Sequence, residues 1–355
     1  MKVISFLILI FSVFVLGCKE NSPNLKIEGT YRIISIRDSL KVMNSDSFRY
    51  LSGVKEIFQI GKDSLLVIPD KDNVFYITNN DLEIIDIHNF KNNEFMIKPP
   101  IMGTALYNNE VYFVDMSFVV KKYNIQTRIV RALPLMNRAN NMLDVYNDST
   151  IIGTEQMIEY PALVYGNGRP FKDENKILIG TKSKGKTFAG VPIYAEKEDY
   201  GDFSFVKAEI AYSRVFKDKM YYIFNLSKKV MIYDIEGKFL NSAELLVDDS
   251  YYKTPSESYM NGRKGISFSE LTSQPLVPYN NYLTHLFRSE SGKNPEIICY
   301  DLEFRPIAKY QIDNEKNGNV SFIRRYWFCN NKLYTTNGFN GITVFEMVRN
   351  NDEAK

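Results

Sequence analysis

Short apolar stretches alternate with small polar clusters along most of this chain, and one arrangement recurs six times. Each copy consists of an apolar residue, two or three polar residues rich in Asn or Asp, and a second apolar stretch. Asn and Asp tolerate the positive φ angles that tight hairpin turns require. Each copy therefore predicts a β-hairpin whose turn is anchored on one of six residues: Asp63, Asn109, Asp148, Asp218, Asn281 and Asn331.

The hairpins are separated by intervals that suit a propeller. The steps between the anchors are 46, 39, 70, 63 and 50 residues, and periods of about 40 to 50 residues built from short strands are typical of propeller blades. The two long steps predict insertions at 181–207 and 247–278. Most units continue into a third strand, at 74–79, 119–124, 162–166, 229–234, 296–301 and 341–347, and then a fourth, at 82–88, 128–135, 176–180, 238–245 and 306–312.

The two ends of this pattern complement each other. The sixth unit has no room for a fourth strand before the polar tail 349–355, whereas 30–36 forms a strand without a unit of its own. Pairing the first strand with the last unit would complete that unit and cover a sheet edge. The sequence thus predicts an all-β fold: one domain, 27–348, forming a closed six-bladed β-propeller of four-stranded antiparallel blades. An open sandwich, two smaller β domains, or a seventh degenerate blade within 181–207 are the alternatives.

The amino terminus has the features of an export signal. Lys2 precedes an apolar run, 3–16, that is too short for a spanning helix, which needs about 20 apolar residues. Residues 1–17 are therefore typical of a secretory signal peptide. Val15-Leu16-Gly17-Cys18 resembles the lipobox of bacterial lipoproteins, which implies cleavage before Cys18, a diacylglycerol thioether on its sulfur and an acylated amino terminus of the palmitate type. The segment 18–26 would then be a lipidated tether.

The composition of the chain agrees with a β domain and argues against nucleic acid as a partner. The chain has 24 Tyr and 24 Phe, which favour strands. Its 44 basic and 42 acidic residues nearly balance, whereas nucleic-acid-binding chains usually have a strongly basic footprint. With Cys18 assigned to lipid, Cys299 and Cys329 remain in apolar strand sequences, which favours buried thiols over the disulfide that an envelope compartment permits.

One unit carries a family resemblance. The stretch MYYIFNLSKKVMIYDIEGKFLNSAEL, 220–245, resembles an NHL-type blade, with a strand, a polar loop, a strand ending in Tyr-Asp, a Gly turn and a returning strand. Together with the lipobox, the six units are similar to TolB-like six-bladed propeller lipoproteins of Bacteroidetes. The resemblance implies a membrane-anchored envelope protein, and Lys19-Glu20 partly resembles the signal that directs such lipoproteins to the outer surface of the outer membrane. The resemblance implies no catalytic residues in this chain.

Standard catalytic and metal motifs are absent from the sequence. The chain has two histidines, His88 and His285, far apart and without a Cys or acid cluster nearby, so a zinc site is not expected. There is no G-x-S-x-G elbow, no phosphate-binding glycine loop and no EF-hand loop. Both histidines are interpreted as structural.

The repeat itself provides one candidate site. Six or seven residues after each turn anchor, where the second strand should end, equivalent polar positions would form a ring on one face of the propeller, the default place for a ligand. Oxygen ligands of this kind suit Ca²⁺, although an arginine among them would repel the ion, so no cofactor is expected. The alternative is that these residues cap strands and bind loop amides. The ring consists of Asp70, Asp115, Glu155, Asn225, Arg288 and Asn337.

The insertions provide further contacts. Both connect the last strand of one unit to the first strand of the next, so they should lie on the same face as the ring. The second insertion is rich in Tyr, Ser, Asn, Gly and Arg, a composition that makes adaptable contacts. Candidate loop contacts are Arg138, Tyr259, Asn261 and Arg263.

These observations lead to one functional hypothesis and one alternative. We expect a lipid-anchored envelope propeller that binds a protein, peptide or glycan through its loop-bearing face and is more plausibly a binding or scaffold module than an enzyme. The alternative is a six-bladed lactonase, hydrolase or lyase-like enzyme with an axial metal, which requires acid side chains that converge on the axis.

Overall fold

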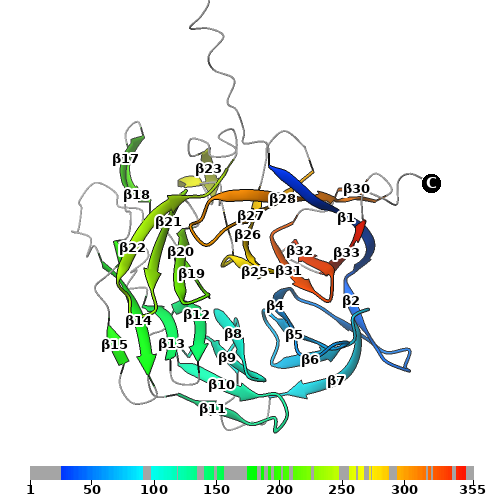
Figure 1. Ribbon diagram of the computed structural model, residues 1–355. Helices are drawn as coiled ribbons and strands as arrows, with labels where there is room; N and C mark the ends of the chain where they lie inside the picture. Colours follow the sequence, from blue (N-terminus) through cyan, green and yellow to red (C-terminus); the bar gives the residue numbers. More distant parts are fainter. Residues whose placement is uncertain are drawn as a thin grey trace, which may run out of the picture.

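The computed structural model is built from β-strands, numbered β1 to β33 along the chain. It describes residues 25–90, 97–117, 119–133, 140–147, 150–155, 174–181, 185–187, 191–192, 196–200, 203–207, 211–224, 228–247, 256–260, 263–267, 272, 274–287, 294–316, 319–320, 323–337 and 341–348. Figure 1 shows the sheets standing side by side around a common centre, in a propeller-like arrangement. In the described ranges, no helix is long and apolar enough to cross a membrane.

Four sheets follow one plan, in which strands consecutive in the sequence lie side by side and antiparallel. Sheet I contains β4 (Val54–Gln59), β5 (Leu65–Pro69), β6 (Val74–Thr78) and β7 (Glu83–Asn89), and is extended by β2 (Ser39–Val42) and β3 (Phe48–Tyr50). Sheet II contains β8 (Gly103–Tyr107), β9 (Glu110–Val114), β10 (Val120–Asn124) and β11 (Val130–Ala132). Sheet III contains β12 (Asn140–Asn147), β13 (Thr150–Glu155), β14 (Glu174–Thr181) and β15 (Gly185–Thr187), with β16 (Val191–Pro192) beside β14. Sheet IV contains β19 (Ala211–Phe216), β20 (Lys219–Phe224), β21 (Lys229–Asp234) and β22 (Phe239–Glu244).

Sheet V joins the two ends of the chain. Its eight strands are, in order, β25 (Val277–Tyr279), β26 (Tyr282–Phe287), β27 (Glu296–Tyr300), β28 (Pro306–Asp313), β1 (Lys26–Arg37), β33 (Ile342–Val348), β32 (Lys332–Thr336) and β31 (Arg325–Cys329). Strand β1 pairs antiparallel with β33, with Tyr31 opposite Met347, and parallel with β28. The amino-terminal strand therefore lies beside the last strand of the chain, the neighbour that the sequence predicts for it.

Two of the smaller sheets lie in the predicted insertions. The strands β17 (Glu196–Tyr200) and β18 (Phe203–Lys207) form a hairpin in the first insertion, and β23 (Ser256–Met260) and β24 (Arg263–Ser267) form one in the second. A third small sheet pairs β29 (Glu315–Lys316) with β30 (Asn319–Val320). In the part of 181–207 that the structure describes, the strands are β15, β16 and this hairpin, and no four-stranded sheet of its own is formed there.

The predicted turn chemistry is confirmed at three hairpins between first and second strands, those anchored on Asn109, Asp218 and Asn331. The anchors Asp63 and Asn281 do not have positive φ angles, and Asp148 lies outside the described residues. Asn108 and Asn109 have φ angles of 48° and 60°, and Asn330 and Asn331 have 50° and 62°. Lys217 and Asp218 share this geometry, with φ angles of 47° and 62°. Two consecutive positive φ angles are the signature of a type I′ turn, whose twist matches that of the flanking strands.

Sheet III corrects one strand assignment. The segment 176–180, predicted as a fourth strand, lies in β14, which pairs directly with β13, with Ile152 opposite Ile179. It is therefore the third strand of its sheet, and β15 lies outside it. The segment 162–166, predicted as the third strand, falls outside the described residues. Both segments are short apolar runs, and the sequence does not say which of two such runs pairs with a given neighbour.

The cores lie between neighbouring sheets and are rich in aromatic rings. Between sheets I and II, Phe75 packs edge-on against Phe90, Phe113 and Tyr123, with ring centroids 4.8, 5.9 and 5.5 Å away. Aromatic pairs of this geometry stabilise a core beyond the area that they bury. Cys299 and Cys329 are buried free thiols, as predicted.

The strands nearest the centre in Figure 1, which we call the inner strands, are β4, β8, β12, β19, β25 and β31. They contact one another across sheet boundaries, β12 with β8 and β19, and β31 with β4. Strand β31 also contacts β25, which lies at the opposite end of sheet V. Each inner strand is followed by a hairpin turn, so the next strand runs back and ends where the inner strand begins.

Candidate functional site

A pocket that is partly open to solvent lies at the beginnings of the inner strands. Met102, Pro275, Val277 and Trp327 form much of its apolar wall. Its charged and polar wall comes from four sheets, through Lys55 and Glu56 of β4, Thr104 of β8, Tyr212 and Arg214 of β19, Gln274 ahead of β25, and Arg325 of β31. A concave site with a few converging polar groups and an apolar wall is the usual form of a ligand pocket.

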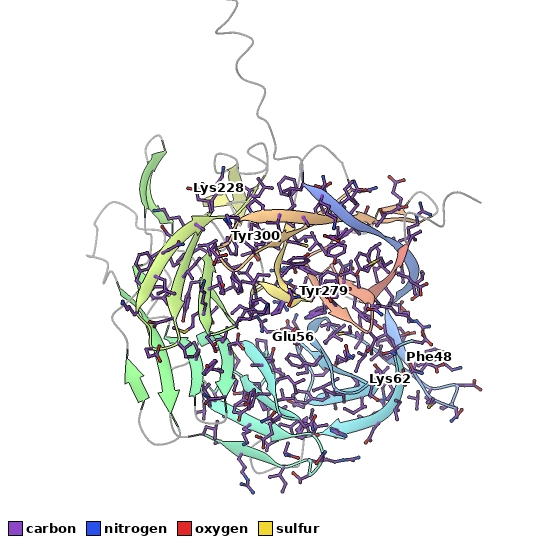
Figure 2. The ribbon with its side chains drawn as sticks, viewed as in Figure 1. Phe48, Glu56, Lys62, Lys228, Tyr279 and Tyr300 are labelled. Atoms are coloured by element: carbon purple, nitrogen blue, oxygen red, sulfur yellow. The ribbon has the colours of Figure 1, made fainter. Side chains whose placement is uncertain are left out.

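Glu56 connects three sheets at this pocket. Its Oε2 accepts a hydrogen bond of 3.1 Å from the Thr104 hydroxyl on β8, and its Oε1 accepts one from the indole Nε1 of Trp327 on β31. Figure 2 shows the labelled Glu56 near the centre of the ring of sheets, far from Phe48 on the peripheral hairpin. Burial raises the pKa of Glu56 above its usual value, although Arg214, Lys55 and the Trp327 hydrogen bond act in the opposite direction.

Lys55 is the neighbouring cation on the same strand. Its ammonium donates a 2.5 Å hydrogen bond to the backbone carbonyl of Met102. No acid in the described part of the chain lies within 4.0 Å of this ammonium. Burial lowers the pKa of Lys55 to about 7, assisted by the positive charge of Arg325 and opposed by Asp70 and Glu56.

Arg214, which lines the pocket, forms an ion pair with Asp144 behind it. Arg214 Nη1 lies 3.6 Å from Asp144 Oδ2, and Arg214 Nε donates to the Leu276 carbonyl at 2.9 Å. The Asp144 carboxylate also accepts backbone N–H bonds from Val145 and Val215. Since Asp144 is on β12 and Val215 is on β19, this carboxylate joins two inner strands. Burial nevertheless raises the pKa of Asp144.

The predicted ring residue Asp115 has a structural role. Its side chain is fully buried and accepts hydrogen bonds from Lys121 Nζ at 2.6 Å, Lys98 N at 2.7 Å and Ser117 N at 2.9 Å. Burial alone would raise the pKa of Asp115, but these donors outweigh it and hold the pKa below its usual value. The carboxylate is committed to its own sheet and loop, as the capping alternative predicts, rather than to a ligand.

The other ring residues have different surroundings. Asp70 is half-buried at the end of β5; its backbone N–H donates to the Gly53 carbonyl at 3.2 Å, and its charge acts on Lys55. Asn337 is exposed. Glu155 ends β13, and its side chain is outside the description, as are Asn225 and Arg288 entirely. Among the ring residues with described side chains, Asp70 is the one linked to the pocket.

The predicted loop contacts lie largely outside the described residues. Arg138 and Asn261 are not described. Tyr259 lies on β23 and Arg263 on β24, in register opposite Lys264 and Met260 respectively, and nothing further is described of their side chains. These residues remain candidates on the basis of the sequence alone.

The predicted ring positions and the pocket lie at the same end of the sheets, but on neighbouring strands. The second strands end beside the beginnings of the inner strands, as in Val54 opposite Pro69 and Gly103 opposite Val114. The pocket is formed one strand further inward than the predicted ring. Lys55, Asp144 and Arg214 are charged residues within strands, but their strands contain other polar residues as well, so the local pattern does not single them out.

The two histidines, His88 and His285, do not line the pocket. His88 is buried between sheets I and II, where its Nε2 lies 3.1 Å from Asp86 Oδ2 and its Nδ1 contacts the Tyr123 hydroxyl. His285 is buried in sheet V. Over the ranges that the structure describes, no three His, Cys, Asp or Glu side chains are grouped as metal ligands.

Comparisons with known proteins add little. No protein-family model matches the chain, and no curated protein matches it. Among solved structures, the crystal structure of the N-terminal domain of Nup159 is similar, with a TM-score of 0.40 and 10% sequence identity over 86% of this chain and 79% of that one. A similarity this low carries no argument about function.

Proposed function

We propose that this chain is a lipid-anchored envelope β-propeller with six blades, closed by β1, that captures a protein, peptide or glycan at the pocket-bearing end of its central axis. It acts as a binding or scaffold module rather than as an enzyme. The pocket is the observation that carries this proposal, because charged side chains from several sheets converge there beside an apolar wall.

The strand order supports six blades. Sheets I to IV each supply four strands that follow one another in the sequence, and sheet V divides at β1 into β25 to β28 and β31 to β33. Assigning β1 to the second group gives each half of sheet V four strands. Closure by β1 would leave no exposed edge between the first and last blades, which is the usual advantage of such a closure.

The surroundings of the acids favour binding over axial metal catalysis. An axial metal in the predicted ring would need oxygen ligands from several ring residues. Asp115 directs its carboxylate to Lys121 and to backbone amides, and Glu56 directs its carboxylate to Thr104 and Trp327. Neither arrangement presents a set of open carboxylate oxygens.

Membrane attachment follows from Cys18 and the preceding apolar run. Cleavage before Cys18 would leave seven residues, 19–25, between the lipid and β1, which starts at Lys26. A fully extended tether of this length reaches about 25 Å, so the propeller would lie close to the membrane, with the outer membrane as the proposed site.

The test is affinity purification of the lipidated protein from its native membrane. We expect a partner that co-purifies with the wild-type chain and is lost when 250–275, which includes the β23–β24 hairpin, is deleted, while the melting curve of the deletion variant still shows a folded domain. The proposal fails if the deletion variant captures the same proteins and glycans in the same amounts. A matched variant, Cys18→Ala, should shift the protein from the detergent phase to the aqueous phase.

A further inference from the structure

The axial pocket has a surplus of positive charge. Its lining includes Lys55, Arg214 and Arg325 against one acid, Glu56. Asp144 lies behind Arg214 and offsets that cation. Lys55 and Arg325, whose charges act on each other, donate hydrogen bonds to the backbone carbonyls of Met102 and Val54 respectively.

Two of the polar side chains that could recognise sugar hydroxyls are already engaged. Thr104 donates to Glu56, and Gln274 pairs with the backbone of Tyr326 through both ends of its amide, at 3.0 and 3.4 Å. An ammonium has three donors, and Lys55 lines the pocket with the Met102 carbonyl as its described acceptor, so it has the capacity to donate further hydrogen bonds to a ligand. Beside this cationic wall are the apolar side chains of Met102, Pro275 and Val277.

From this arrangement we propose that the pocket binds the carboxyl-terminal residue of a peptide, with the α-carboxylate between Lys55 and Arg325 and an apolar last side chain against Met102, Pro275 and Val277. This inference rests on the proposed binding function and specifies its ligand. Capture of a chain-terminal carboxylate is a known mode of peptide recognition, and cationic donors to a carboxylate form the stronger class of hydrogen bond.

Charge at Lys55 gives the site a pH dependence. Lys55 faces Asp70 at the end of β5, Glu56 on its own strand, and Arg324 and Arg325 at the start of β31. Because its pKa is about 7 in the protein, the ammonium loses its proton as the pH rises above neutrality. A bound carboxylate favours the charged form, so affinity should fall between pH 7 and pH 9.

The test uses a peptide library randomised at its last three positions, prepared with free and with amidated carboxyl termini, and the full chain in detergent. We expect the protein to retain free-ended peptides with Leu, Ile, Val, Met or Phe in the last position, and amidation to weaken binding roughly tenfold to a hundredfold. Lys55→Met should cause a similar loss and remove the pH dependence. Lys62→Met, at the exposed turn after β4, should bind like the wild type.

Several results would overturn the inference. Equal retention of free and amidated peptides would exclude carboxylate recognition. N-acetylleucine or hexanoate binding as tightly as the best peptide would assign the site to small free acids instead. If no peptide is retained while the partner capture described above persists, the peptide inference fails and the binding function stands. Thermal melts separate loss of binding from unfolding, since removing the buried Lys55 charge should not lower the melting temperature.

Discussion

Single charged residues lie in two kinds of surroundings in this protein. Asp115 and Lys121 form a sealed pair whose side chains are 0% and 6% exposed. Glu56 and Lys55 line a pocket that is open to ligands. Buried charge is costly unless it is paired and hydrogen-bonded, so the first pair should control stability and the second should control binding and its pH dependence.

Removal of the Asp115 charge should destabilise the fold strongly. Asp115→Asn keeps the shape of the side chain but leaves the buried Lys121 ammonium without its carboxylate, and we expect a loss of about 3–5 kcal/mol in the free energy of unfolding, measured by urea denaturation. Glu28→Gln, which removes the acid from the exposed pair with Lys26, is the matched control and should leave the midpoint nearly unchanged. The double variant Asp115→Asn, Lys121→Met should recover part of the loss. Equal midpoints for Asp115→Asn and the control would contradict this role.

Low pH should weaken the ion pair between Asp115 and Lys121. The pKa of Asp115 in the folded protein is lower than its usual value of 3.8, so its contribution to stability is present above that value and is lost as the pH falls through the lowered pKa.

The contribution of Glu56 to the stability of the fold should have the opposite pH dependence. Its pKa is raised above the usual 4.5 in the folded protein, so its contribution to stability is greatest below that value and is lost as the pH rises through the raised pKa. Glu56→Gln can still accept from Trp327, so its stability relative to wild type should increase between pH 4 and pH 8 in urea titrations. Glu56→Ala removes the acceptor for the buried indole N–H and should cost about 1–3 kcal/mol. A constant difference between wild type and Glu56→Gln over this pH range would refute the assignment.

The pocket residues were not predicted because a charged residue in a short strand usually indicates a solvent-facing position. In Val54–Gln59, the pair Lys55-Glu56 fits that interpretation. Only the arrangement of sheets around a centre turns the beginnings of the inner strands toward one another, and single-strand patterns do not contain that information. Asp115 was predicted as a strand-end residue, but its partners Lys98 and Lys121 lie in two other segments.

At the scale of elements, the hairpin turns determine the strand register and were the most predictable feature. The turn residues Asn108 and Asn109 identified the β8–β9 hairpin from sequence because few residues accept two positive φ angles. The order of strands within sheet III was less predictable, since the pairing of β14 with β13 depends on neighbours rather than on local sequence.

A turn substitution tests this interpretation. Asn109 has a φ of 60°, and Asn109→Val places a β-branched side chain in the left-handed region, which should cost about 1–2 kcal/mol in the free energy of unfolding. Asn109→Gly should be close to wild type, because glycine adopts this conformation without strain. Urea denaturation of both variants provides the comparison, and equal stability of the valine and glycine variants would show that the turn does not require a positive φ.

At the scale of the whole molecule, β1 connects β28 to β33. Tyr31 on this strand is fully buried, and its hydroxyl donates to that of Tyr279 at 3.2 Å. The amino-terminal strand therefore contributes both backbone pairing and core packing, and it starts close to the proposed lipid anchor.

Deletion of residues 1–37 should therefore prevent stable monomer formation. Two strand edges, those of β28 and β33, would become available to other chains, and the buried Tyr31 would be lost. We expect oligomers or aggregates in size-exclusion chromatography, whereas a chain that lacks only 1–24 should be a folded monomer. A monomeric 38–355 chain with an unchanged melting temperature would show that β1 is dispensable.

Partner binding at the axial pocket can be tested by site-specific photo-crosslinking in the native membrane. A photoreactive residue is placed at Tyr212, which lines the pocket, or at Lys62, in the exposed turn at the other end of β4. We expect a discrete adduct from the Tyr212 position that is lost in the Lys55→Met background, and none from the Lys62 position. Equal adducts from both positions, or adducts from Lys62 alone, would contradict it.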